Sequence, residues 1–105
     1  MSRERLRNRR LSETFALELD GLRYVATFSR FADGRVAEVF LQNHKSTSQS
    51  DSNARDSAIA ASLALQYGCP LDALRRALLR DGQGRASTPL GAALDRIAEI
   101  EGERR

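Results

Sequence analysis

The sequence predicts an α+β fold, in which a three-stranded antiparallel meander is followed by three helices packed on one face of the sheet. Apolar and polar residues alternate with period two from Ser12 to Gln42. The pairs Asp20-Gly21 and Asp33-Gly34 interrupt this pattern and suit two-residue hairpin turns, because glycine accepts the positive φ that such turns need. Beyond Asn53, apolar residues recur at helical spacing. A chain of 105 residues fits one small domain.

The two turns fix the register of the predicted sheet. Across the first turn Leu17 lies opposite Tyr24, and across the second Phe28 lies opposite Val39. A shift of one residue would move every side chain to the other face, yet both turns place the apolar residues on the same face. That face is predicted to line the core and consists of Phe15, Leu17, Leu19, Leu22, Tyr24, Ala26, Phe28, Ala37, Val39 and Leu41.

The opposite face of the predicted sheet is half apolar. Val25, Phe31, Val36 and Phe40 lie on it among polar and charged residues. An exposed apolar patch of this kind marks an association surface, and two-fold dimers are the commonest oligomers. We therefore expect a homodimer that buries these four side chains.

The first predicted helix follows a polar loop at residues 43–53 and runs roughly from Ala54 to Tyr67, where Gly68 ends it. Ile59, Leu63 and Tyr67 recur at helical spacing, so they are predicted to face the core. The alanines beside them allow a close approach to the sheet.

Two further helices are expected. One runs from Pro70 to about Arg80 with Leu71, Leu74 and Leu78 pointing inward, and the other starts at Thr88-Pro89 with a stripe of Leu90, Leu94, Ile97 and Ile100. Residues 12–100 then form the domain. Residues 101–105 are expected to fray, and residues 1–11 to form an Arg-rich flexible arm because they offer too little apolar surface to bury.

Composition narrows the function. The 17 basic residues are largely offset by 14 acidic ones, for a net charge of +3, which permits a nucleic-acid partner without demanding one. One cysteine, Cys69, and one histidine, His44, supply neither a disulfide framework nor a zinc ligand set. We therefore assign no catalytic residue, metal or cofactor. The longest apolar runs fall short of a membrane span, so we expect no membrane partner and a cytoplasmic location.

An anion site is predicted where the strand region meets the first helix. Lys45, Ser46, Thr47 and Ser48 lie just before the helix, and Arg55 lies near its start. A cation, hydroxyl groups and the free N–H groups of a helix N-terminus can hold a phosphate or a nucleotide. The segment differs from the Gly-x4-Gly-Lys-Ser/Thr loop, and the alternative interpretation is a solvated loop before a capped helix.

Arginines suggest an alternative function, nucleic-acid binding through contacts to phosphates. A helix with a charged face is more often simply solvated, and no aromatic residues lie between these arginines as single-strand binding would require. The candidate residues are Arg3, Arg5, Arg7, Arg9 and Arg10 in the arm, and Arg75, Arg76 and Arg80 along the second helix.

The run from Gly34 to Asp95 resembles the TSCPD domain. This small domain is found near the C-terminus of adenosylcobalamin-dependent ribonucleotide reductases and in short free-standing proteins. The resemblance rests on the segments Val36–Gln42, Ala54–Gly68 and Leu90–Asp95 and extends roughly from Leu11 to Ile97. The chain lacks the Thr-Ser-Cys-Pro-Asp string after which the domain is named.

The resemblance implies a fold and an association, and it transfers no catalytic residue. Ribonucleotide reduction uses a thiyl-forming cysteine and a reducing pair, whereas this chain has one cysteine. We therefore expect a non-catalytic interaction or regulatory module linked to a ribonucleotide reductase, with a nucleotide or phosphate as its candidate ligand. A small nucleic-acid-binding protein is the alternative.

Overall fold

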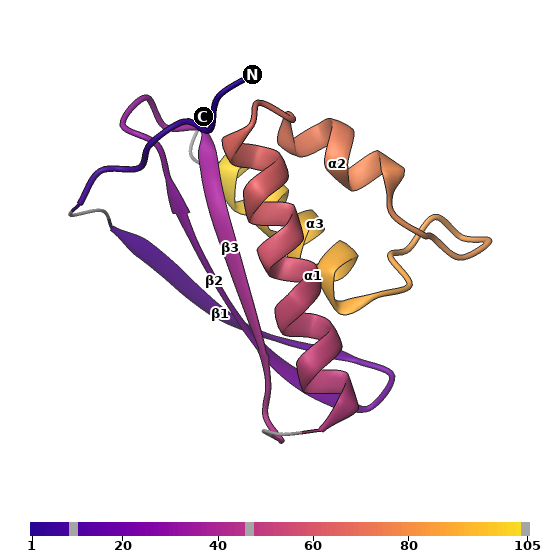
Figure 1. Ribbon diagram of the computed structural model, residues 1–105. Coiled ribbons are helices and arrows are strands. Elements are labelled where there is room, and N and C mark those ends of the chain that lie inside the picture. The colour runs from indigo at the N-terminus through magenta and orange to yellow at the C-terminus, as the bar shows by residue number, and fades with distance from the viewer. Residues whose placement is uncertain (9–10, 46–47, 104–105) are drawn as a thin grey trace.

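The computed structural model describes residues 1–8, 11–45 and 48–103. One antiparallel sheet, in the order β1-β2-β3, precedes three helices, and in Figure 1 the long helix α1 runs beside β3. The predicted α+β fold is confirmed. The elements are β1 (Ser12–Leu19), β2 (Leu22–Arg30), β3 (Val36–Asn43), α1 (Gln49–Gln66), α2 (Leu71–Ala77) and α3 (Pro89–Glu103).

The predicted register is confirmed for both hairpins. Leu17 lies opposite Tyr24 in the first, and Phe28 lies opposite Val39 in the second. The first turn is the expected two-residue turn, since Asp20 has φ +53 and the glycine after it has φ +80. Two successive positive φ values match the right-handed twist of the strands that the turn joins.

The second turn differs from the prediction. Phe31 N–H donates to the carbonyl oxygen of Arg35 at 2.8 Å, and Gly34 N–H donates to that of Phe31 at 3.0 Å, so the loop holds three residues instead of two. A register shift between Ser29 and Arg30 compensates for the extra residue. Three-residue hairpin loops commonly carry such a bulge.

The bulge also changes the outer face of the sheet. Because the extra residue breaks the period-two alternation, Val36 is only 7% exposed and Phe31 only 4%. Their predicted place in an exposed patch is therefore wrong. The outer face keeps Val25, at 40% exposure, and Phe40, at 48%.

The core lies between the inner face of the sheet and the helices α1 and α3. Phe28, Val39, Leu94 and Ile97 are its largest fully buried side chains. The predicted inward stripe of α3 is confirmed, with Ile100 partly buried at its end. From α1 the core receives the small side chains Ala54, Ala58 and Ala61 together with Leu65.

The helix α1 starts earlier than predicted and is rotated differently about its axis. It begins at Gln49, five residues before the expected start, with Ser48 as its N-cap. The predicted core stripe is wrong, since Ile59, Leu63 and Tyr67 are 52%, 39% and 45% exposed.

The free edge of β3 explains this rotation. The hydroxyl of Ser62 accepts the N–H of Val39 at 2.9 Å and donates to the carbonyl of the same residue at 2.8 Å. The side-chain amide of Gln66 donates to the carbonyl of Ala37 at 3.1 Å. A buried backbone group without a partner is costly, so α1 turns polar side chains toward β3 and its apolar stripe toward solvent.

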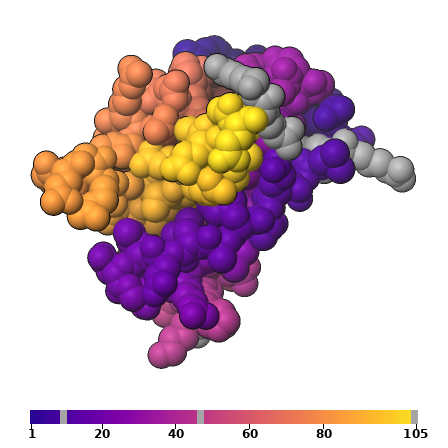
Figure 2. All heavy atoms as spheres, turned by 180° about the vertical axis from the view of Figure 1, so that it is seen from behind, coloured from indigo at the N-terminus to yellow at the C-terminus, as the bar shows by residue number. Residues whose placement is uncertain are grey.

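The apolar side chains after α1 pack as predicted, but α2 and α3 end at residues other than those predicted. Helix α2 ends at Ala77, before the expected Arg80. Helix α3 continues to Glu103, and Glu101 accepts a hydrogen bond from Arg30 Nε at 2.9 Å, so residues 101–103 are helical where fraying was expected. Figure 2 shows α3 between α2 and the β1–β2 hairpin, with the segment after α2 projecting to one side.

The N-terminal segment packs on the domain where it is described. Glu4 N–H donates to the carbonyl of Gln66 at 2.7 Å, and the Glu4 carboxylate accepts two hydrogen bonds from Arg35 at 2.7 and 2.9 Å. Arg3 Nε donates to the side-chain oxygen of Gln66 at 2.5 Å. Residues 3 and 4 therefore contact both the end of α1 and the β2–β3 turn.

A pair of substitutions in α1 tests its rotation. Leu65→Ala should lower the free energy of unfolding by about 2–5 kcal/mol, because it leaves a cavity in the core, whereas Leu63→Ala should lower it by less than about 1 kcal/mol. Urea denaturation at sub-micromolar chain concentration, where association does not contribute, measures both. The opposite ranking would restore the stripe predicted from the sequence.

Candidate functional site

The rotation of α1 creates an apolar surface that continues onto the sheet. Ile59, Val25 and Phe40 line one hollow of about 240 Å³ between α1 and the outer face. Leu63 and Tyr67 follow Ile59 at successive turns of the helix. We call these five residues the association surface. Exposing apolar area to water is unfavourable in free energy. Grouped apolar side chains mark binding sites more often than isolated ones do.

The predicted anion-binding loop is partly used in capping α1. Ser48 accepts the N–H of Asp51 at 3.1 Å and donates to the carbonyl oxygen of Lys45 at 3.0 Å. The Lys45 residue is exposed. Ser46 and Thr47, the other two predicted residues, lie outside the described ranges.

Arg55, the fifth predicted residue, pairs with a carboxylate of α1 itself. Its Nε donates to Asp51 Oδ2 at 2.8 Å, and the Asp51 side chain is only 5% exposed. The other oxygen of Asp51 accepts the N–H of Asn43, the last residue of β3, at 2.8 Å. A negative charge in the first turn already complements the helix dipole, so part of the attraction of this end of α1 for an anion is taken up within the chain.

Two of the three predicted helix arginines form a clasp between α2 and α3. Arg80 binds Asp95 through two contacts of 2.7 and 2.8 Å, and Arg75 Nε donates to the same carboxylate at 3.0 Å. Arg80 also donates to the carbonyl of Gly84 in the intervening loop at 3.0 Å. Arg76 is exposed. These contacts leave the predicted basic ridge with fewer guanidinium groups directed at solvent.

The described arm arginines divide between two hollows, since Arg3 and Arg5 line one along the N-terminal segment and Arg7 lines another. Arg3 binds Gln66, Arg5 is exposed, and Arg7 lines a hollow of about 670 Å³ over the outer face of the sheet. Arg9 and Arg10 lie outside the described residues. Nucleic-acid binding by these side chains stays a prediction.

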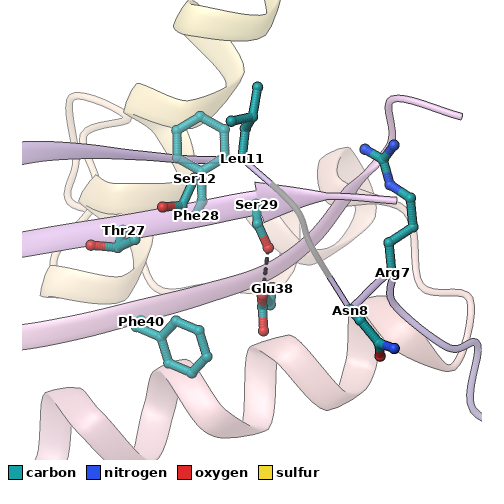
Figure 3. Close-up of a pocket in the computed structure, with 9 residues that line it drawn as sticks. All are labelled: Arg7, Asn8, Leu11, Ser12, Thr27, Phe28, Ser29, Glu38 and Phe40. Atoms are coloured by element: carbon teal, nitrogen blue, oxygen red, sulfur yellow. Dashed lines mark hydrogen bonds between the residues drawn. The ribbon is translucent and has the colours of Figure 1, made fainter. Parts of the chain in front are cut away.

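Figure 3 shows that hollow between the N-terminal segment and strands β2 and β3. Ser29 donates to the buried carboxylate of Glu38 at 2.5 Å across the two strands. Sequence reasoning missed this region because it treated the arm as flexible. The available signal was the cross-strand pair itself, a serine opposite a glutamate on the outer face.

A second hollow, of about 730 Å³, lies where the β2–β3 turn meets the α1–α2 junction and the end of α3. Cys69 lines it and is partly exposed. Arg35 and Arg75 also line it, and each is paired with carboxylates. Among the described residues, no three His, Cys, Asp or Glu side chains are grouped as a metal site.

The ion pairs of Asp95 with Arg75 and Arg80 should make the free energy of unfolding depend on pH. Hydrogen bonds from Arg80 hold the pKa of Asp95 below its ordinary value of 3.8, so its stabilising contribution is complete above that value and is lost as the pH falls through the lowered pKa. Asp95→Asn should lower the free energy of unfolding at neutral pH by about 1 kcal/mol, since partial exposure screens the pair.

Urea denaturation as a function of pH measures this effect. The gap between the wild type and Asp95→Asn should narrow in acid. Asp72→Asn is the control, because the Asp72 side chain is 67% exposed and its ion pair should contribute little. A gap that stays constant down to strong acid would show that Asp95 does not act through its charge.

Thermal melting tests the predicted anion site. With Asp51 at the start of α1, we expect inorganic phosphate and nucleoside triphosphates at millimolar concentration to leave the melting temperature unchanged. A stabilisation that Lys45→Ala removes would instead establish a site there. In that case the buried amide nitrogen of Asn43, which has no hydrogen-bond partner in the described structure, would be the first donor to examine.

Comparison with known proteins relates the chain to part of a large enzyme. The vitamin B12-dependent ribonucleotide reductase of Agrobacterium fabrum is 39% identical over 70 residues, and that of Bradyrhizobium diazoefficiens is 37% identical over 70 residues. Each match covers 67% of this chain but 6% of the relative. No family model matches the chain, and no solved structure matches it. No described helix is long and apolar enough to cross a membrane. The chain is thus related to a short region of vitamin B12-dependent ribonucleotide reductases.

Proposed function

We propose that this chain is a non-catalytic association module, related to a region of the vitamin B12-dependent ribonucleotide reductases and of the TSCPD type. The observation that carries the proposal is the association surface, where five large apolar side chains are 39–52% exposed on α1 and the outer sheet face. Apolar groups that the fold does not need for its own core suit contact with another protein.

The polar and charged residues predicted to bind a ligand support association over chemistry. Ser48, Arg55, Arg75 and Arg80 are held by contacts within the chain. The single cysteine, Cys69, supplies neither a reducing pair nor a partnered nucleophile. The four described polar and charged side chains are engaged in contacts that hold the fold together, whereas association needs only the surface.

The resemblance to the TSCPD domain fits the same view. Its three segments correspond to β3, α1 and the first half of α3, which pack together in the core. They contribute Val39, Ala58 and Leu94 to it. The resemblance is therefore carried by the scaffold that positions the association surface, and we infer that the scaffold serves to present α1 to a protein partner.

A binding experiment with a full-length vitamin B12-dependent ribonucleotide reductase tests this proposal. The tagged chain should retain the reductase on an affinity matrix, and Leu63→Arg should weaken retention by about tenfold or more. Leu63 is already 39% exposed, so the substitution should leave the fold intact, which circular dichroism checks.

Leu79→Arg is the matched control. Leu79 is 69% exposed and lies in the segment between α2 and α3, outside the association surface. The proposal requires Leu79→Arg to retain the reductase as the wild type does. Equal retention by Leu63→Arg would contradict it, and so would the absence of any association, with the reductase or between copies of the chain, that depends on Leu63.

A further inference from the structure

The exposed side of α1 has a relief that fits a copy of itself. Ile59, Leu63 and Tyr67 form a ridge with a spacing of four residues. Beside the ridge, at the same spacing, Ala60 and Ala64 form a row of small side chains, with Ala60 exposed and Ala64 partly buried. A tall row next to a short row on one helix is the shape that interdigitates when two such helices cross.

A two-fold axis brings each ridge onto the row of the other copy. When rows of four-residue spacing pack together, the helices cross at about −50°, and an interface of this kind uses the same patch on both chains. The alanines allow the two helices to approach closely, and Leu63 of each copy then packs against Ala60 of the other.

Polar groups at the two ends of the exposed side of α1 can also pair in this arrangement. Asp56 lies at the N-terminal end of the exposed face and Tyr67 at the C-terminal end, and both are exposed. An antiparallel pairing places the phenol hydroxyl of one copy near the carboxylate of the other, where it can donate a hydrogen bond to an ionised acceptor. A parallel pairing would instead set the two carboxylates side by side.

The size of the surface meets what a small dimer needs. Aromatic side chains bury about 150–250 Å² each, and taking the lower part of that range for the aliphatic ones, exposures of 39–52% over five residues leave roughly 400 Å² in water. Interfaces are about 60% apolar, which implies about 650 Å² per copy. The total of about 1,300 Å² lies at the lower end of the range of specific interfaces when Val25 and Phe40 are buried together with the ridge of α1.

We propose that the partner of the association surface is a second copy of this chain, joined by antiparallel packing of α1 on α1 about a two-fold axis. This rests on the association module proposed above and names its partner. It replaces the dimer expected from the sequence, for which two of the four predicted side chains, Phe31 and Val36, are buried inside one chain.

Sedimentation velocity of the full chain at tens of micromolar is the first test. The wild type should sediment as a dimer that dissociates on dilution. Leu63→Arg and Ala60→Trp should each raise the dissociation constant about tenfold or more, the first by placing a charge in the ridge and the second by filling the row. Leu79→Arg should sediment as the wild type does.

Ala60→Trp separates this arrangement from other dimers. A dimer formed by the outer sheet face alone would tolerate it and would be disrupted by Phe40→Glu. Dimerisation that survives Ala60→Trp would therefore overturn α1–α1 packing.

Disulfide cross-linking tests the geometry directly. In a Cys69→Ser background, Ala60→Cys should form a disulfide-linked dimer under mild oxidation. A disulfide joins residues whose Cα atoms are about 4.4–6.8 Å apart, and residue 60 of the two copies lies close to the two-fold axis. Leu79→Cys should not. Equal cross-linking at both positions would reject the pairing.

A wild-type monomer at tens of micromolar would overturn the proposal of a second copy. The association module itself would still stand if retention of the reductase depended on Leu63. If neither self-association nor retention depended on that residue, both proposals would fall.

Discussion

The free edge of β3 is the constraint on which the rest of the structure depends. A sheet edge presents unpaired N–H and C=O groups that invite pairing with another chain, and here α1 covers it with side chains instead of a fourth strand. Ser62 satisfies both backbone groups of Val39, Gln66 binds the carbonyl of Ala37, and Asp51 accepts from Asn43. These contacts span the length of β3, so they fix the position and the rotation of the helix together.

Covering the edge determines which residues of α1 remain available for a partner. One side of the helix is committed to the β3 backbone and an adjacent side to the core through Ala54, Ala58 and Leu65. The small alanines permit the close approach that hydrogen bonds from short side chains require. Ile59 and Leu63 therefore lie on the remaining side of the helix and are exposed to solvent. The apolar surface is thus a consequence of how the sheet ends.

The sheet was predictable from the sequence because its register is a local property, whereas the rotation of α1 was not. Asp20-Gly21 fixed the first hairpin, and a bulge kept the second register despite its longer turn. The helix stripe failed because periodicity assumes that apolar residues face inward, and nothing local shows that Ser62 must meet β3. The pairing of Arg80 with Asp95 was equally hidden, since it joins separate helices.

The arrangement assigns stability and the proposed association to different residues of the same helix. Ser62 and Leu63 are neighbours in sequence, yet the first is 7% exposed and holds β3 while the second is 39% exposed and has no comparable role in the core. A helix with a polar and alanine-rich buried side can therefore carry an apolar exterior at little cost to the fold. For a chain related to 6% of a large enzyme, this division matters, because the contact proposed for the exposed side of α1 would not use the residues that hold the fold together.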